Sequence, residues 1–153
     1  MYIDSYMSQA ITLAELAFDK DEVPVGALVV KDGIVIGQGY NKVISQNSVS
    51  SHAEIIAINE ASQRIRNYRL TQCEIYVTLE PCHMCAKAIV DARLGYLYFG
   101  AWEPKTGAIL SIDQFLDRKD LNHQVRYSGG HMKKKSSDLL KNFFLSKRKS
   151  KKI

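Results

Sequence analysis

Three side chains of this sequence, His52, Cys82 and Cys85, are of the types that bind zinc. A catalytic zinc ion takes three protein ligands and leaves a fourth position for water, and one imidazole with two thiolates meets that requirement. Cys82 and Cys85 lie three residues apart, so on a helix they share one face. His52 and Cys82 are each expected to open a helix, where the helix dipole stabilises a thiolate. The pattern therefore predicts one Zn²⁺ per chain, bound by these three residues.

A carboxylate, Glu54, follows His52 by two residues. This spacing does not align the two side chains along a helix, so Glu54 is a less natural ligand for the same ion and better suited to carry a proton beside it. Zinc lowers the pKa of its water toward neutrality. A His-x-Glu followed by Pro-Cys-x-x-Cys, here Pro81 to Cys85, is typical of zinc enzymes that remove an amino group from a nucleobase. We therefore expect Glu54 to be catalytic.

The Cys-x-x-Cys spacing alone has other interpretations, because thioredoxin-like redox sites and structural zinc sites share it. A structural zinc would need a fourth ligand, for which Cys73 and His83 are the nearby candidates. Cys73 is expected before a strand, at the end far from the helix, and His83 points away from the ligand face. A redox pair would not require the upstream His-x-Glu. The cysteine count, three, also argues against a framework of disulfides.

Apolar periodicity and turn residues indicate which elements position these side chains. Pro24 ends a first helix, Asp32-Gly33 marks a hairpin turn, and Pro81 suits the first turn of a helix. Helices that alternate with strands after a hairpin imply an α/β layered domain with a sheet of about five strands. The expected helices are 5–18, 53–66, 81–93 and a short one at 112–116, and the expected strands are 25–30, 34–40, 74–79, 96–99 and 125–127.

Composition bounds the remaining possibilities. The 153 residues suffice for one domain, 1–153, and 46% hydrophobic residues can form a core. No apolar run is long enough for a membrane span, and the first ten residues lack the order of a secretory signal, so a cytoplasmic protein is expected.

The net charge of +5 is concentrated at the C-terminal end, because residues 133–153 contain nine basic residues and one acidic residue. Such a segment, about 132–153, is either a solvated tail or a surface attracted to phosphates. Within it, an apolar helical stripe is expected to pack on the domain and to leave one phenylalanine at an RNA-binding edge. The stripe consists of Leu139, Leu140, Phe143 and Phe144.

Nearly the whole chain resembles the bacterial tRNA-specific adenosine deaminases, the TadA family of the cytidine/deoxycytidylate deaminase superfamily. The resemblance implies a cytidine-deaminase-like three-layer α/β/α fold, a zinc ion, a homodimer, and conversion of the wobble adenosine of a tRNA anticodon stem-loop to inosine. The motifs that carry it are Glu22-Val23-Pro24-Val25-Gly26-Ala27, His52-Ala53-Glu54-Ile55, Asn67-Tyr68-Arg69-Leu70, Tyr76-Val77-Thr78-Leu79-Glu80-Pro81-Cys82, Lys105-Thr106-Gly107-Ala108 and Asn122-His123.

The resemblance also implies roles for individual residues. His52, Cys82 and Cys85 would hold zinc, and Glu54 would move a proton from water to N1 of adenine and help the amine leave. Asn41 would contact the flipped base, although without the resemblance it would be taken for a turn residue after a strand.

Several positions depart from the family pattern: His83, Trp102, Glu103, the loop 47–51 and the lysine-rich segment 131–137. Trp102 could stack on a base or pack against the protein. Two other functions remain open. One is a deaminase of free bases or nucleosides, which the flanking motifs and basic tail disfavour. The other is a zinc-stabilised RNA-binding subunit without activity, which has no need of the Glu54 that this chain keeps.

Overall fold

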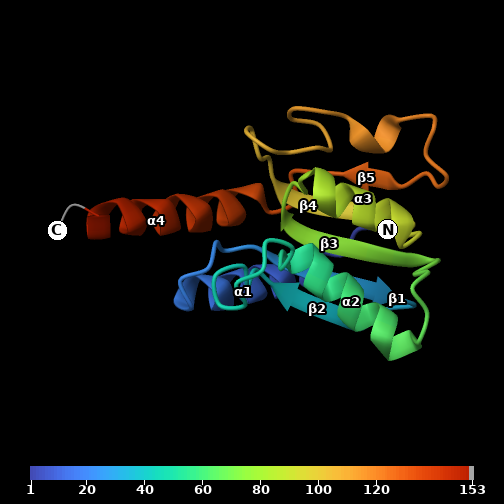
Figure 1. The fold of residues 1–153 in the computed structure, drawn as a ribbon, viewed down its shortest axis with the longest axis horizontal. Helices are drawn as coiled ribbons and strands as arrows, with labels where there is room; N and C mark the ends of the chain where they lie inside the picture. Colours follow the sequence, from blue (N-terminus) through green and yellow to red (C-terminus); the bar gives the residue numbers. More distant parts are fainter. Residues whose placement is uncertain (152–153) are drawn as a thin grey trace.

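The computed structural model describes residues 1–151 and contains alternating helices and strands. Figure 1 shows a central sheet with helices packed against it and a last helix that extends beyond the body of the fold. In chain order the elements are α1 (Asp4–Asp19), β1 (Gly26–Lys31), β2 (Ile34–Tyr40), α2 (Ala53–Ile65), β3 (Cys73–Leu79), α3 (His83–Asp91), β4 (Tyr96–Ala101), the 3₁₀ turn η1 (Phe115–Asp117), β5 (Arg126–Ser128) and α4 (Lys133–Lys151).

Within the described residues, the sheet has five strands in the order β2-β1-β3-β4-β5. Strand β1 is antiparallel to both β2 and β3, whereas β3, β4 and β5 run parallel. The expected hairpin turn is present, and Asp32 and Gly33 both have positive φ, of 50° and 76°, as its type requires. Because β2 and β3 run in the same direction, their C-terminal ends lie at one edge of the sheet.

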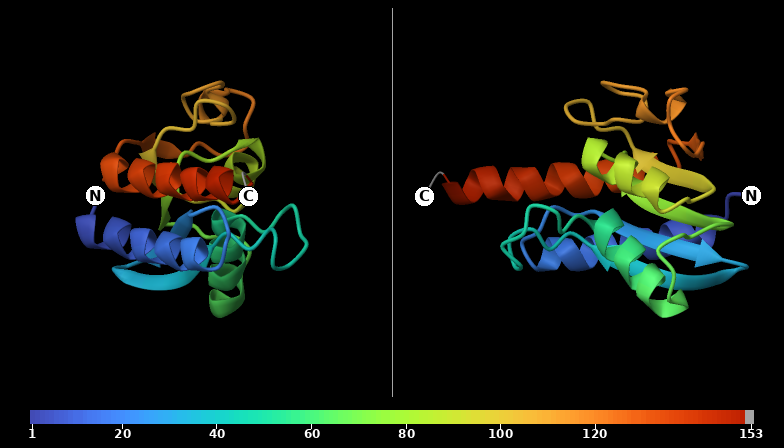
Figure 2. Two further views of the ribbon diagram at one scale, coloured as in Figure 1. Left: turned by 90° about the vertical axis from the view of Figure 1, so that its left-hand side faces the viewer. Right: turned by 45° about the vertical axis from the view of Figure 1, so that its right-hand side comes forward.

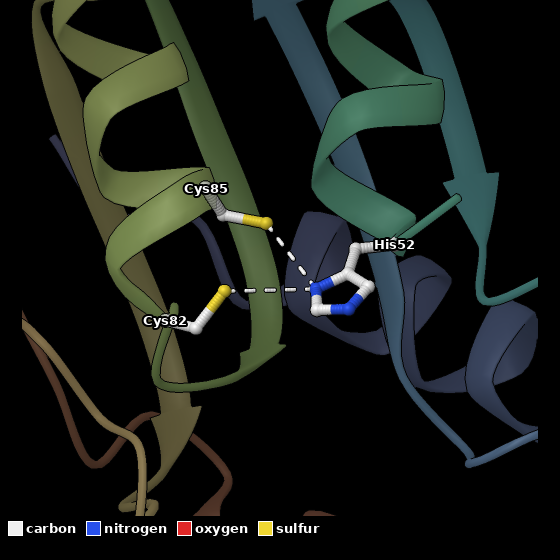
Figure 3. A group of neighbouring side chains, drawn as sticks. All are labelled: His52, Cys82 and Cys85. Atoms are coloured by element: carbon white, nitrogen blue, oxygen red, sulfur yellow. Dashed lines mark hydrogen bonds between the residues drawn. The ribbon is translucent and has the colours of Figure 1, made fainter. Parts of the chain in front are cut away.

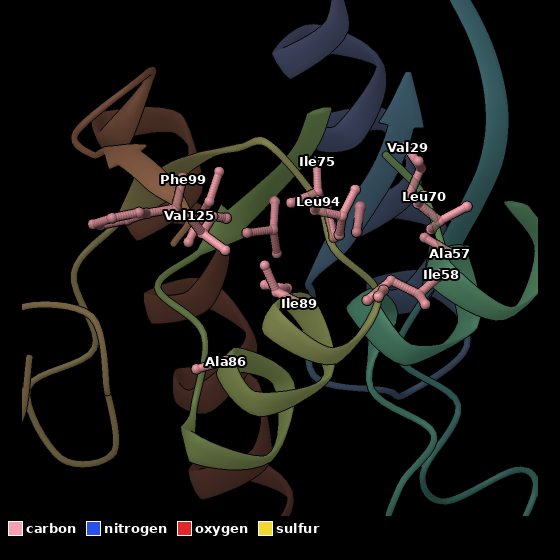
Figure 4. Close-up of a cluster of buried hydrophobic side chains, with 14 of the residues drawn as sticks. Val29, Ala57, Ile58, Leu70, Ile75, Ala86, Ile89, Leu94, Phe99 and Val125 are labelled. Carbon is pink, nitrogen blue, oxygen red and sulfur yellow. The ribbon is translucent and has the colours of Figure 1, made fainter. Parts of the chain in front are cut away.

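The alternation of side chains along the strands gives the sheet two apolar faces. Val29 of β1 and Ile75 of β3 pack against α2 and α3, whereas Leu28 and Tyr76 face α1. Figure 4 shows part of the first cluster, and Figure 2 shows α1 and α4 side by side on the opposite face. The three-layer α/β/α arrangement is therefore confirmed.

Helix α2 lies very close to strand β2, and the glycines of β2 make that approach possible. A Cβ atom at Gly37 would overlap the backbone of Ala57 and Ala61, and one at Gly39 would meet Ile56. Any larger residue would push the helix outward. This contact fixes α2, and with it the N-terminal end that carries His52 and Glu54.

The expected elements are present, with most boundaries shifted by one or two residues; the helix predicted at 81–93, for example, is His83–Asp91. The short helix expected at 112–116 is the 3₁₀ turn Phe115–Asp117, and the last strand begins one residue later than expected. None of the helices in residues 1–151 is long and apolar enough to span a membrane.

The apolar stripe of α4 packs on the domain only in part. Phe143 is buried and lies edge-on to Phe18 of α1, with ring centroids 5.7 Å apart, whereas the next residue, Phe144, is 47% exposed. Leu139 and Leu140 are half-buried. Helix α4 contacts α1, β3 and β4, and its C-terminal part extends beyond the body of the fold (Figure 1). One phenylalanine is thus left exposed, as expected.

Candidate active site

The proposed metal ligands meet where two helices begin. His52 is the N-cap of α2 and Cys82 is the N-cap of α3, with Cys85 in the first turn of that helix. These helices follow the C-terminal ends of β2 and β3, which lie at the same edge of the sheet. Residues 30 apart in the sequence are therefore brought together by the parallel orientation of two strands.

The three side chains form a compact cluster (Figure 3). Their donor atoms all lie within 4.8 Å of one another. Nδ1 of His52 is 3.7 Å from Sγ of Cys82 and 3.5 Å from Sγ of Cys85. A tetrahedral zinc with Zn–S near 2.3 Å and Zn–N near 2.0 Å would separate a sulfur from a nitrogen ligand by about 3.5 Å. The donor types and spacings of this cluster therefore fit a zinc ion.

The thiols of the cluster have different acidities. Hydrogen bonds from Cys85 and His52 outweigh the effect of burial and lower the pKa of Cys82 to about 4. The hydrogen bond to Cys82, together with burial, raises the pKa of Cys85. The hydrogen bond to Cys82 also raises the pKa of His52. The cluster therefore stabilises a thiolate at Cys82, the form in which cysteine binds metals.

Glu54 lies in the first turn of α2 and is 4% exposed. Burial raises the pKa of its carboxyl to about 7, although its own backbone N–H and the charge of His52 act in the opposite direction. A carboxyl with a pKa near neutrality can both accept and release a proton, which is the property that general acid–base catalysis requires. The structure thus brings Glu54 beside the cluster.

A cavity of about 310 Å³ opens at this point. His52, Glu54 and Cys82 line it together with Asn41 and Thr106. The side-chain oxygen of Asn41 accepts a hydrogen bond of 2.8 Å from the backbone N–H of Ala53. Asn41 therefore helps to hold the start of α2, while the NH₂ group of its amide remains available as a donor.

Two buried carboxylates in the cavity wall, Glu22 and Glu80, were not assigned a role from the sequence. Each is 2% exposed. Glu22 accepts hydrogen bonds from the backbone N–H groups of Ile44, at 3.0 Å, and Ser45, at 2.7 Å. Burial opposes ionisation of Glu22, but these bonds outweigh it and hold its pKa below the ordinary value. Glu22 thus anchors the loop that forms one wall of the cavity.

Glu80 anchors the opposite wall. Its carboxylate accepts hydrogen bonds from the backbone of Glu103 and of residues 109–111, as well as from the Ser111 hydroxyl. Burial raises its pKa, but the bonds from Ser111 and the backbone more than compensate and lower it. An acidic residue directly after a buried apolar strand was the available signal for Glu80.

A second hollow, of about 600 Å³, lies between the loop after β4 and helix α4. We call it the basic groove. The chain of Glu103, Pro104 and Lys105 forms one side, and the other side is formed by Leu140, Lys141, Phe144, Lys147 and Arg148. Four of these residues are cations, and the exposed ring of Phe144 lies among them. Cationic side chains around an exposed aromatic ring are typical of surfaces that bind single-stranded nucleic acid.

The other positions singled out in the sequence lie apart from the cluster. Cys73 is buried at the start of β3, the opposite end of that strand from Cys82. Nε2 of His83 is 2.8 Å from a carboxylate oxygen of Asp113, so this side chain faces away from the ligands. Trp102 is 41% exposed and packs edge-on against Phe99, with centroids 5.0 Å apart.

Comparison with known proteins agrees with this geometry. The family model of the MafB19-like deaminases matches residues 1–148. The chain is 43% identical over 151 residues to a tRNA-specific adenosine deaminase of Haemophilus influenzae, covering 98% of this chain and 87% of that protein. It is 40% identical to the tRNA-specific adenosine deaminase of Aquifex aeolicus, covering 91% of each chain.

A solved structure from a study of A-to-I editing by tRNA deaminases at the wobble position of transfer RNA superimposes with a TM-score of 0.87. It is 39% identical, and the match covers 90% of this chain and 100% of that one. The fold and the His/Cys cluster are thus those of a deaminase with a possible metal site. The chain belongs to the MafB19-like deaminases. It also belongs to the family of the tRNA-specific adenosine deaminases.

Proposed function

We propose that this protein deaminates adenosine to inosine at the wobble position of a tRNA anticodon, with zinc held by His52, Cys82 and Cys85. The observation that carries the proposal is the arrangement of one cavity, which joins the donor cluster to the buried carboxyl of Glu54. The names of the relatives supply the substrate class. Zinc, when bound, would supply a water activated at neutral pH.

Glu54 is the proton carrier in this proposal. Its carboxylate takes one proton from water and delivers it to N1 of the adenine ring as the water oxygen bonds to C6. It then takes the second proton, from the hydroxyl group now on C6, and gives it to the amino group, so that the C6–N bond breaks, ammonia leaves and the carbonyl of inosine forms. Water and adenosine are consumed, and inosine and ammonia are formed. Burial supports this role, because it raises the pKa of Glu54 to about 7 and keeps both protonation states accessible.

Asn41 would hold the base in the cavity. Its oxygen is already used by the N–H of Ala53, so its NH₂ group is the part that can donate to a ring nitrogen or hydroxyl. The wobble base would have to leave its stack to reach the cavity, and an anticodon loop, whose bases are unpaired, lowers the cost of that step.

The basic groove would hold the flanking RNA. Lys141 and Arg148 would neutralise phosphates, and Phe144 would stack on a base. Lys147 is only partly available, because its amino group is 3.0 Å from a carboxylate oxygen of Asp21. The lysine-rich end that the sequence indicated continues through Lys152, which with Ile153 lies outside the described residues.

The proposal also includes three properties that follow from the resemblance: one domain over residues 1–153, a homodimer and a cytoplasmic location. Light scattering of the purified protein would measure the assembly. A monomeric mass at assay concentrations would refute the dimer without affecting the proposed chemistry.

The decisive experiment measures inosine in a transcribed anticodon stem-loop that bears a wobble adenosine. The wild-type protein should form inosine. The rate of Glu54→Ala should be lower by about 10²–10⁴-fold or more. Glu60→Ala is the matched control, because Glu60 is an exposed carboxylate on the same helix. Zinc content should be unchanged in both variants. Zinc-loaded wild-type protein that forms no inosine would refute the proposed substrate, and near-normal rates for Glu54→Ala would refute its role.

A further inference from the structure

Glu80 lies between the His52–Cys82–Cys85 cluster and the loop that forms one side of the basic groove. It follows the end of β3 and precedes Pro81 and the proposed ligand Cys82. Its side chain turns into the protein and is 2% exposed. A carboxylate in this position must be satisfied by hydrogen bonds, because a buried unpaired charge is very costly.

All the hydrogen bonds that satisfy this carboxylate come from one loop, residues 103–111. Oε2 accepts three consecutive backbone N–H groups, of Ile109 at 3.1 Å, Leu110 at 2.7 Å and Ser111 at 2.9 Å. Oε1 accepts the N–H of Glu103 at 3.0 Å and the hydroxyl of Ser111. Successive N–H groups directed at one oxygen form an anion-binding nest, and here the anion is a side chain of the protein itself.

The same loop borders both the cavity beside Glu54 and the basic groove. Thr106 lines the cavity together with His52, Glu54 and Cys82. Glu103, Pro104 and Lys105 line the basic groove on the other side. The position of this loop therefore determines how far the groove lies from the cavity and in which direction.

We propose that Glu80 is a positioning residue for the nucleic-acid substrate: it fixes loop 103–111 so that RNA seated in the basic groove delivers its target base to the cavity. This inference rests on the proposed function. Glu80 touches neither the base nor the water. It acts through the loop, so its removal should weaken productive binding of the stem-loop more than the turnover of bound substrate.

Glu80→Gln tests this with little change in shape. The amide oxygen can replace Oε2 and keep the three N–H groups of residues 109–111. The amide NH₂ then faces the N–H of Glu103, and two donors cannot bond each other, whereas the hydroxyl of Ser111 can turn and accept. The substitution therefore removes the hydrogen bond from the backbone N–H of Glu103 and keeps those from residues 109–111. Glu103 is where the loop begins to line the basic groove.

Gly107→Ala tests the same contact from the other side. A Cβ at Gly107 would overlap the carboxylate of Glu80 and the carbonyl oxygen of Glu103, so the loop must move although the charge is retained. Glu74→Gln is the matched control. Glu74 is a carboxylate near the other end of β3, the strand that Glu80 follows, and it pairs with the N-terminal amine at 3.7 Å.

The experiment measures KM and kcat for the anticodon stem-loop, together with zinc content and Tm. For Glu80→Gln and Gly107→Ala we expect KM to rise about tenfold, the effect of losing one hydrogen bond to a charged group, with kcat within about twofold and full zinc content. Glu74→Gln should match the wild type. A purely structural role would instead lower Tm and the active fraction, which reduces kcat and leaves KM unchanged, and that result would overturn the inference.

The two proposals fail in different ways. Wild-type protein that forms inosine, with KM unchanged in both loop variants, refutes the positioning role alone. Wild-type protein that forms no inosine refutes the proposed function and, with it, the role of Glu80.

Discussion

Removing two cations of the basic groove should change how salt affects RNA binding. The variant combines Lys141→Ala and Arg148→Ala, two exposed residues of α4 that line the groove. Lys147 is left in place because it pairs with Asp21 and lies over the ring of Phe143, so its removal would disturb packing as well as charge. We expect weaker binding of the stem-loop with a smaller dependence on salt.

The magnitude follows from counterion release. Each phosphate that a cation neutralises contributes about 0.7 to the slope of log K against log salt for a single strand. Two cations therefore account for about 1.4 of that slope. Between 50 and 200 mM salt, the wild type should lose roughly sevenfold more affinity than the double variant.

The assay is fluorescence anisotropy of a labelled anticodon stem-loop at several salt concentrations. The control combines Lys119→Ala and Arg126→Ala, which removes the same two residue types from exposed positions outside the groove. The control should keep the wild-type slope. If the groove variant and the control have equal slopes, the cations of α4 do not contact phosphate and the assigned RNA path is wrong.

Four further outcomes are expected. Deletion of residues 147–153 should weaken RNA binding and leave zinc bound, which anisotropy and metal analysis can check. Cys82→Ala should lose the metal and lower Tm, because metal binding contributes to folding; full zinc content would contradict its role as a ligand. Phe143→Ala should lower the free energy of unfolding by about 3 kcal/mol in urea titrations, since it removes a ring that is 4% exposed. Glu22→Gln should reduce the fall in the free energy of unfolding at acidic pH. The pKa of Glu22 in the folded protein lies below its ordinary value of 4.5, so the carboxylate stabilises the fold above that pH. This contribution disappears as the pH falls through the folded pKa. Urea unfolding of the wild type and of Glu22→Gln at several pH values measures the difference, and parallel curves would contradict it.

The clustering of His52, Cys82 and Cys85 could be predicted from the sequence because its signals are local. Pro81 and the Cys-x-x-Cys spacing mark a helix start, and His52 precedes a second helix. Each half of the cluster is therefore indicated by a short segment of sequence. The hairpin at Asp32-Gly33 was predictable for the same reason. What brings the halves together is the parallel orientation of β2 and β3, which the alternation of elements implies.

The anchors of the cavity walls could not be predicted in this way. Glu22 and Glu80 bond to backbone N–H groups 22 to 31 residues away, and a backbone donor has no side-chain type by which a sequence could reveal it. The two faces of α4 posed a similar problem. Phe143 and Phe144 are adjacent and chemically alike, and only the line of contact with α1 decides that the first is buried and the second exposed.

The local motifs alone do not distinguish a tRNA deaminase from a deaminase of free bases. The His-x-Glu and Pro-Cys-x-x-Cys motifs are shared by zinc nucleobase deaminases, so they specify the reaction without specifying the substrate. A free base would need the cavity alone. A polynucleotide also needs a surface beside the cavity at a fixed distance from it, and we propose that this surface is the basic groove between loop 103–111 and α4. Glu80 bonds to that loop and is separated from Cys82 by Pro81 alone, so in our proposal it connects the shared chemistry to the substrate-specific surface.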